Sequence, residues 1–180
     1  MRRCGSLPGE WRNSKACSAK HISLRMLEPH QRALLAAQGY CELGMFDDAI
    51  AEVAALPDGA RQHPTAIELR LVILMQAKRY QDALTASREL CHRDPEKPTG
   101  FIHAAYCLHE LGHTSEAREV LLGGPSTLHT EPTFHYNLAC YECRLGNLEL
   151  ARLHLEKSIA LDKKFRDFAA TDPDLEPLRA

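Results

Sequence analysis

The sequence lacks the features that define membrane proteins and nucleic-acid-binding proteins. Lysine and arginine number 22 against 24 acidic residues, so the net charge is −2 and no basic excess attracts phosphate backbones or anionic lipid. No stretch approaches the roughly 20 consecutive apolar residues of a transmembrane helix. These absences predict a soluble protein that binds neither nucleic acid nor a membrane.

Motifs for catalysis are missing as well. The chain has no Gly-x-Ser-x-Gly nucleophile motif and no glycine-rich phosphate-binding loop, because Gly123-Gly124 is followed by Pro125 and not by a helix that carries lysine. The ten histidines are dispersed, which favours packing or surface positions over a shared site. We therefore expect a protein that is not an enzyme and uses no cofactor.

The first 25 residues are basic and poor in acids, with six lysines or arginines against Glu10 alone. They contain no apolar run of signal-peptide length. An arginine-rich, acid-poor leader also fits an organellar transit peptide, although Pro8 and Gly9 leave it without a clear amphipathic helix. We predict a disordered basic tail over residues 1–25, with a transit peptide as the alternative.

Cysteine usage indicates the compartment. The seven cysteines are an odd number, and a chain of 180 residues can bury a core without disulfide bonds. The sequence therefore predicts reduced thiols and a cytoplasmic location.

What the sequence does contain is a repeat of 34 residues. The Pro-Thr pairs that begin at positions 64, 98 and 132 stand 34 residues apart, and glycines at 44, 112 and 146 follow the same period. Lys78 takes the place of glycine in the second unit. Proline is tolerated in the first turn of a helix, and glycine readily adopts the left-handed conformation that ends one. The pattern predicts stacked helical hairpins, with a strained or differently closed turn at Lys78.

One residue of the repeat is the same in all four units. Alanine recurs at the start of each second helix, at Ala49, Ala83, Ala117 and Ala151. A small side chain at a fixed place in a helical hairpin indicates that two helices cross closely there, because a larger side chain would force them apart. We therefore expect all four alanines to be buried.

The pattern resembles that of the tetratricopeptide repeat family from about Glu28 to Lys164. The match is closest in the fourth unit, which has Tyr136-Asn137-Leu138-Ala139, Gly146, Ala151 and Ala160-Leu161-Asp162. The sequence departs from the family at Arg70, where a hydrophobic residue is usual, and at Pro57 and Gly123-Gly124-Pro125, which shorten two second helices. The resemblance implies an all-α, right-handed solenoid of four hairpins over residues 26–165, with a capping segment over residues 166–180.

The same resemblance implies a groove, lined by the first helices, that holds a protein or peptide. By the match, the groove residues are Leu34, Gln38, Glu68, Val72, Met75, Ile102, Tyr106, His109, Tyr136, Cys140 and Arg144. This largely apolar and aromatic set suits an apolar helix or extended segment as ligand. A competing hypothesis makes Glu68, Glu110 and Arg144 the recognition set.

Some family members grip acidic chaperone tails with a clamp of lysine, asparagine and arginine. Here the matching positions hold other residues, namely Leu34, Gln38, Leu69, Thr99 and His103. Binding of such tails is therefore disfavoured.

Three functional hypotheses remain. The first is a general protein-binding scaffold in the cytoplasm, and the second is a chaperone similar to the class II chaperones of type III secretion, which shield hydrophobic segments. The third, of a different class, is a thiol or metal protein built on Cys140-x-x-Cys143, whose thiols would share a helical face close to His109. The partner, the process and the oligomeric state stay open.

Overall fold

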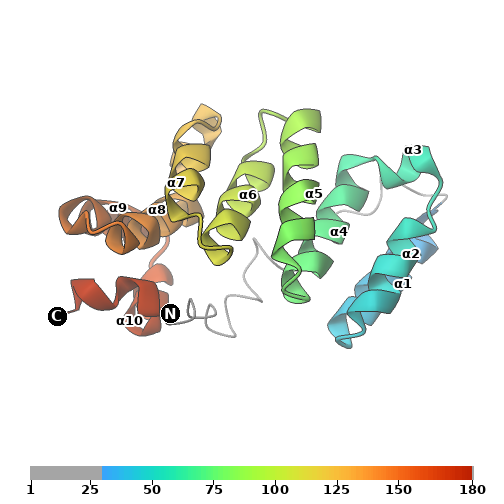
Figure 1. Cartoon of the computed structure of the whole chain (residues 1–180), viewed down its shortest axis with the longest axis horizontal. Helices are drawn as coiled ribbons and strands as arrows, with labels where there is room; N and C mark the ends of the chain where they lie inside the picture. Colours follow the sequence, from blue (N-terminus) through green and yellow to red (C-terminus); the bar gives the residue numbers. More distant parts are fainter. Residues whose placement is uncertain (1–29, 180) are drawn as a thin grey trace.

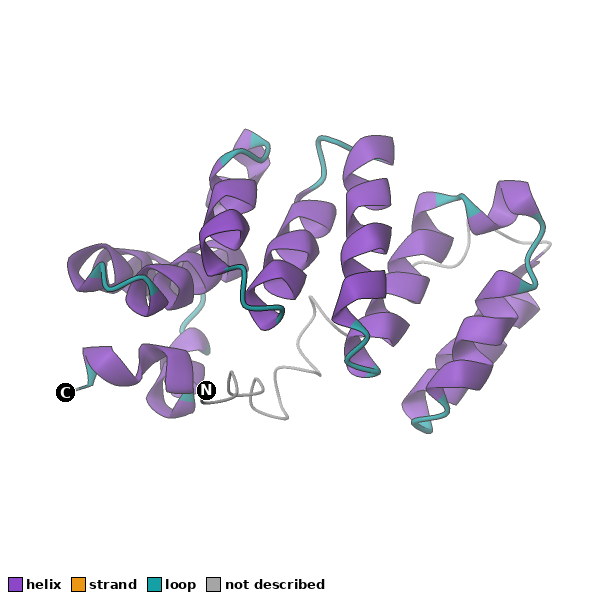
Figure 2. Cartoon of the chain, viewed as in Figure 1, coloured by secondary structure: helices purple, strands orange, loops and turns teal. Residues whose placement is uncertain are grey.

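The computed structural model describes residues 30–179, and no strand occurs within them (Figure 2). The predicted basic tail of residues 1–25 lies outside the described part of the chain. The elements, in order, are α1 (Gln31–Glu42), α2 (Phe46–Ala54), α3 (Asp58–Arg61), α4 (Pro64–Gln76), α5 (Tyr80–Arg93), α6 (Pro98–Glu110), α7 (Thr114–Leu122), η4 (Ser126–Thr130), α8 (Pro132–Arg144), α9 (Leu148–Leu161), α10 (Phe165–Thr171) and η5 (Pro173–Leu178). None of the helices in residues 30–179 combines the length and the apolar character needed to cross a membrane.

The predicted hairpins are confirmed in register. The described residues form four antiparallel pairs, α1 with α2, α4 with α5, α6 with α7 and α8 with α9, and these stack side by side into a curved α-solenoid (Figure 1). Each pair buries an apolar stripe that it cannot cover alone, so each needs its neighbour.

The repeated sequence markers coincide with helix ends. The prolines of the three Pro-Thr pairs are the first residues of α4, α6 and α8, where the missing amide would have had no helical partner. At α4 the preceding residue adds a cap, since Nδ1 of His63 accepts a hydrogen bond from the Thr65 amide at 3.3 Å.

The turn at Lys78 has the same geometry as the glycine turns, so it is strained and not differently closed. Lys78 has φ 58, in the left-handed region that Gly44, Gly112 and Gly146 also occupy. Its amide bonds to the carbonyl of Met75 at 3.0 Å, as the Gly112 amide bonds to His109 at 2.9 Å. A side chain at positive φ costs free energy that glycine avoids, so this turn is less favourable than its three counterparts.

The alanines of the repeat are confirmed as close-packing positions. Ala49, Ala83, Ala117 and Ala151 are all fully buried. The two shortened second helices are confirmed as well: α2 and α7 have 9 residues each, against 14 in α5 and α9.

The core consists of two apolar clusters that share α4. Leu69, Val72 and Ile73 of α4 belong to a cluster with α1 and α2, whereas Leu71 and Leu74 belong to a second cluster that extends to the C-terminal end. Eight of the 13 residues of α4 are buried, because the helix is covered from both sides.

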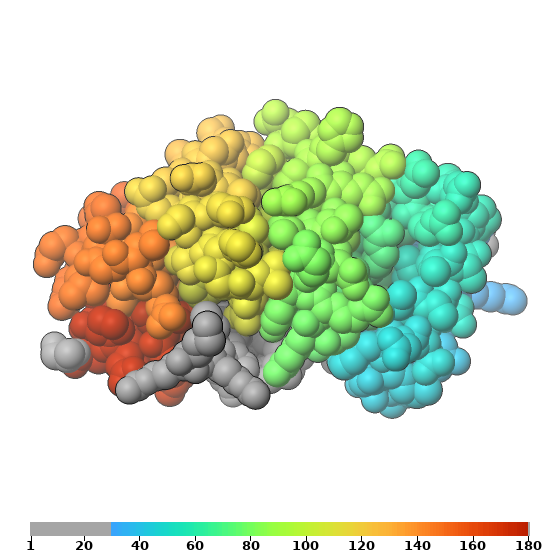
Figure 3. All heavy atoms as spheres, in the orientation of Figure 1, coloured from blue at the N-terminus to red at the C-terminus, as the bar shows by residue number. Residues whose placement is uncertain are grey.

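The chain after α9 folds back onto the fourth hairpin. The ring of Phe165 lies 5.0 Å from the ring of Tyr136, centroid to centroid, and Leu175 is buried in the second cluster. Figure 3 shows these C-terminal residues, in red, against the orange surface of α9. The segment thus lies against both helices of the fourth hairpin.

Candidate protein-binding surface

All eleven predicted groove residues lie on the first helices of the hairpins, α1, α4, α6 and α8, and we call the surface that they were predicted to form the first-helix face. The structure buries seven of them, which are Leu34, Val72, Met75, Ile102, His109, Tyr136 and Cys140. Gln38, Glu68 and Tyr106 are half-buried, and Arg144 is exposed. Most of the apolar side chains in the predicted groove are therefore inaccessible to a ligand. The groove residues that a ligand could still contact are polar or aromatic.

The buried apolar members serve the packing between hairpins. Leu34 and Val72 belong to the cluster of α1, α2 and α4, and Met75 and Ile102 belong to the second cluster. Their burial corrects their assignment to an exposed groove. Apolar side chains between stacked hairpins stabilise the fold by packing against the neighbouring helix, which removes their surface from water.

On α6, Tyr106 and Glu110 form a half-buried cluster with Tyr80, the first residue of α5. The rings of Tyr80 and Tyr106 meet edge to face, with centroids 6.1 Å apart. Burial raises the pKa of Tyr80 to about 12 and also raises the pKa of Glu110 above its ordinary value, while hydrogen bonds from the two phenols counteract part of the shift at Glu110. The cluster thus presents a partly desolvated carboxylate beside aromatic surface.

Tyr80 was missed as a site residue. Only the fold brings it from the start of α5 to the end of α6. No sequence signal marks Tyr80 as a binding residue.

On α4, Glu68 is a second half-buried carboxylate. Burial raises its pKa, and the nearby charge of Lys97 opposes that shift. Lys97 itself is held by Asp94, with Nζ and Oδ2 2.6 Å apart. Glu68 and Glu110 therefore place two acidic side chains on the part of the first-helix face that α4 and α6 form.

The first-helix face of α8 is covered by the C-terminal segment. The Tyr136 hydroxyl donates to Oδ2 of Asp172 at 2.7 Å, and Nε2 of His109 lies 2.9 Å from Oδ2 of Asp174. The other ring nitrogen of His109 lies 3.0 Å from the Thr114 hydroxyl, so both nitrogens have partners. Burial of His109, Tyr136 and Cys140 thus results from the protein's own C-terminus, which the repeat pattern does not place there.

The two thiols of Cys140-x-x-Cys143 are buried and unpaired with each other. Burial raises the pKa of Cys140 well above its ordinary value and raises that of Cys143, which keeps both in the thiol form. Among residues 30–179 no group of three or more His, Cys, Asp and Glu side chains is placed to hold a metal ion. His109, the expected third partner, bonds to Asp174 and Thr114 instead.

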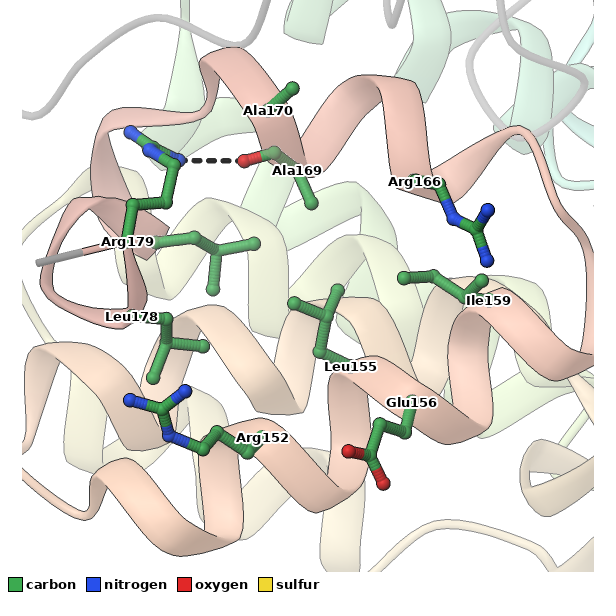
Figure 4. A pocket seen from close by; sticks show the side chains of 10 residues that line it. Arg152, Leu155, Glu156, Ile159, Arg166, Ala169, Ala170, Leu178 and Arg179 are labelled. Carbon is green, nitrogen blue, oxygen red and sulfur yellow. Dashed lines mark hydrogen bonds between the residues drawn. The ribbon is translucent and has the colours of Figure 1, made fainter.

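A shallow pocket of about 330 Å³ lies between α9 and the C-terminal segment (Figure 4). Its apolar wall is formed by Leu155 and Ile159 of α9 together with Leu175 and Leu178. Three arginines also line it, which are Arg152, Arg166 and Arg179. Arg179 is used internally, since its Nη1 donates to the carbonyls of Ala169 at 2.6 Å and Asp172 at 3.0 Å.

Solved structures of MamA share this fold. The chain is similar to MamA MSR-1 C2, with a TM-score of 0.60 and 19% sequence identity over 86% of this chain and 96% of that chain. It is also similar to a MamA RS-1 ArsTM double mutant, with a TM-score of 0.63 and 16% identity over 86% of this chain and 89% of that chain. No family model matches the sequence, and no curated protein does either. At such identities the likeness shows a common tetratricopeptide-like α-solenoid fold and nothing about function.

Proposed function

We propose that this chain is a non-catalytic protein-binding scaffold that holds a segment of a partner protein along α4 and α6. The observation that carries the proposal is two half-buried carboxylates on α4 and α6, the first helices near the middle of the described solenoid. Glu68 lies near Lys97 at the start of α4, and Glu110 lies beside the Tyr80–Tyr106 ring pair at the end of α6. Stacked hairpins offer an extended surface of this kind, and function in such folds resides in that surface.

The ligand that fits best carries a basic side chain next to an apolar or aromatic one. A purely apolar segment would bury Glu68 and Glu110 further without adding a cation to Lys97 near Glu68 or to the two phenols at Glu110, and the loss of water around each carboxylate costs free energy. A lysine or arginine at each carboxylate would pair with it, and an apolar side chain next to the one at Glu110 would pack on Tyr106. The proposed ligand is therefore an amphipathic segment and not the purely apolar one expected from the sequence. Of the competing recognition set, we keep Glu68 and Glu110.

The secretion-chaperone hypothesis depends on an open apolar strip, and the burial of Val72, Met75 and Ile102 removes most of that strip. The thiol or metal hypothesis depends on accessible thiolates, and burial of Cys140 and Cys143 disfavours them. The free thiols in the described chain suit a reducing compartment, so a cytoplasmic scaffold remains our proposal.

The test begins with capture of a partner by the full chain and mapping of the bound segment. Binding of that segment is then measured for Glu68→Gln with Glu110→Gln, and for Tyr106→Ala. We expect the double variant to bind about tenfold more weakly at low salt, with a smaller loss at high salt, because a charge pair contributes on the order of 1–3 kcal/mol when partly desolvated.

Loss of the Tyr106 ring should weaken binding by on the order of 2 kcal/mol, as for other buried aromatic anchors. The matched control is Glu116→Gln with Glu119→Gln, which removes the same charge from exposed positions of α7 and should change nothing. Equal affinity in the test and control pairs would refute a ligand along α4 and α6.

A further inference from the structure

The C-terminal segment is seated on α8 and the end of α6 in the manner of a bound peptide. Asp172 and Asp174 stand two residues apart, and each directs a carboxylate at the first-helix face. Oδ2 of Asp172 accepts from the Tyr136 hydroxyl at 2.7 Å and lies 3.9 Å from the thiol of Cys140. Oδ2 of Asp174 bonds to His109 at 2.9 Å, and its Oδ1 lies 3.6 Å from Nε of Arg144.

These contacts are unlike those that an end cap requires. A cap has to cover apolar surface, and Phe165 and Leu175 do so. The two aspartates are buried as well, with only 2% of Asp172 and 8% of Asp174 exposed. Removal of a carboxylate from water is costly unless specific donors receive it. Within the segment the Asp174 amide donates to Oδ1 of Asp172 at 2.9 Å, and the other donors come from two different hairpins. Burial raises the pKa of Asp172, which agrees with that cost.

The receiving residues are those that the repeat pattern assigns to a binding groove. His109 lies on α6, and Tyr136, Cys140 and Arg144 follow each other along one face of α8. Between them they supply a phenol, an imidazole and a guanidinium, all aimed at carboxylate oxygens. Leu175, 1% exposed, fills the apolar part of the same contact.

We propose that α8 and the end of α6 form a second peptide site, specific for two carboxylates two residues apart followed by leucine, and that residues 172–178 of this chain fill it as a displaceable occupant. A tethered segment acts as a competitor at millimolar effective concentration, so a partner with the same Asp-x-Asp-Leu chemistry gains access only when it binds more tightly or when the tether opens. This site borders the ligand surface on α4 and α6, because His109 stands next to Glu110 on α6, but the proposal does not rest on that surface.

The first experiment measures binding of a labelled peptide with the sequence of residues 172–180 to the full chain. In the full-length variant Asp172→Ala with Asp174→Ala, the internal segment loses the contacts of its two carboxylates, while Tyr136, His109 and Arg144 remain to receive the peptide. We expect this variant to bind the peptide at least tenfold more tightly than the unmodified chain. Glu176→Ala, an exposed acid of the same segment, is the matched control and should behave like the unmodified chain.

The second experiment changes the receiving side. Tyr136→Phe keeps the ring beside Phe165 but removes the donor to Asp172, and Arg144→Ala removes an exposed cation. Added to the double aspartate variant, either change should weaken peptide binding several-fold, and a peptide with asparagine for both aspartates should not bind. Arg152→Ala, at the neighbouring pocket, should have no effect.

A third measurement keeps the proposal testable if the double variant does not fold. In the otherwise unmodified chain, Tyr136→Phe should speed amide hydrogen exchange of residues 172–179 about fivefold while exchange in α8 and α9 stays unchanged. Faster exchange of α8 together with the segment, or no peptide binding by a folded double variant, would show that the segment is only a structural cap. Either result would leave the test with Glu68, Glu110 and Tyr106 variants unaffected.

Discussion

The middle of the first-helix face differs from its C-terminal end. The helices α4, α6 and α8 begin with the same Pro-Thr pair and run for 13 residues each, yet Glu68 and Tyr106 stay half-buried while every residue of α8 from Thr133 to Cys143 is buried. The difference does not come from the helix itself. It arises because α8 is the first helix of the last hairpin. The returning chain covers its first-helix face, while α7, η4 and α9 cover its other sides, so similar repeats differ in accessibility according to their place in the stack.

The largest expected effect comes from a change in the packing at the C-terminal end of the first-helix face. Phe165→Ala removes a fully buried ring that packs against Tyr136 and Phe168, and we expect the free energy of unfolding to fall by about 3–5 kcal/mol. Denaturant unfolding measures the change. Leu35→Ala in α1, half exposed in the open first hairpin, should cost less than about 0.5 kcal/mol. Similar losses in both variants would mean that the C-terminal end is no better packed than the first hairpin.

A second prediction compares interior and surface alanines within hairpins. Ala117→Leu overfills the fully buried crossing of α6 and α7 and should destabilise the fold by about 1–3 kcal/mol. Ala160→Leu adds the same atoms at an exposed position of α9 and should be nearly neutral. Thermal melts of both variants give the answer, and an unchanged melting temperature for Ala117→Leu would contradict the packing described above.

A third prediction concerns the one turn that departs from the repeat. Lys78→Gly relieves the positive φ of Lys78 and should stabilise the second hairpin by up to about 1 kcal/mol, since part of the relief is lost to the greater freedom of glycine in the unfolded chain. Gly112→Lys, the converse change at the matching turn of the third hairpin, should destabilise by a similar amount. Denaturant midpoints that move in the same direction would show that something other than backbone strain decides these turns.

The smallest expected effect is a pH dependence between α8 and α9. Nδ1 of His135 and Nδ1 of His154 lie 3.2 Å apart, and Nε2 of His135 donates to the His129 carbonyl at 3.1 Å. Burial lowers the pKa of both histidines below 6.5. As pH falls past 6.5 the unfolded chain takes up protons that the folded chain does not, so stability should decline on the acid side.

Denaturation at several values between about pH 7.5 and pH 5.5 tests this sign. His154→Gln should reduce the slope, because it removes one of the two histidines whose pKa burial lowers. A stability that rises as the pH falls would mean that the histidine pair is better accommodated when charged.

The hairpins and their register could be predicted because the information is local and periodic. Each Pro-Thr pair specifies a helix start within a few residues, and each alanine specifies a crossing within one hairpin. The site could be predicted only in part. His109 and Asp174 are 65 residues apart in the sequence, and Tyr136 and Asp172 are 36 residues apart. Both aspartates follow the last repeat, so the 34-residue period does not relate them to their partners. The accessible face of α4 was likewise overestimated, because the pattern identifies apolar positions without saying which neighbour covers them.

The sharing of α4 by two apolar clusters has a consequence for how the solenoid comes apart. The first hairpin is joined to the rest mainly through Leu69, Val72 and Ile73 on one side of α4, while Leu71 and Leu74 on the other side belong to the larger cluster. Loss of α1 and α2 would therefore leave the buried residues of the larger cluster in place and remove only the contact with Ile50 of α2. In a stretching experiment that pulls on residue 30 and residue 179, the first hairpin should detach as a separate early step, and α4 should mark where that step ends.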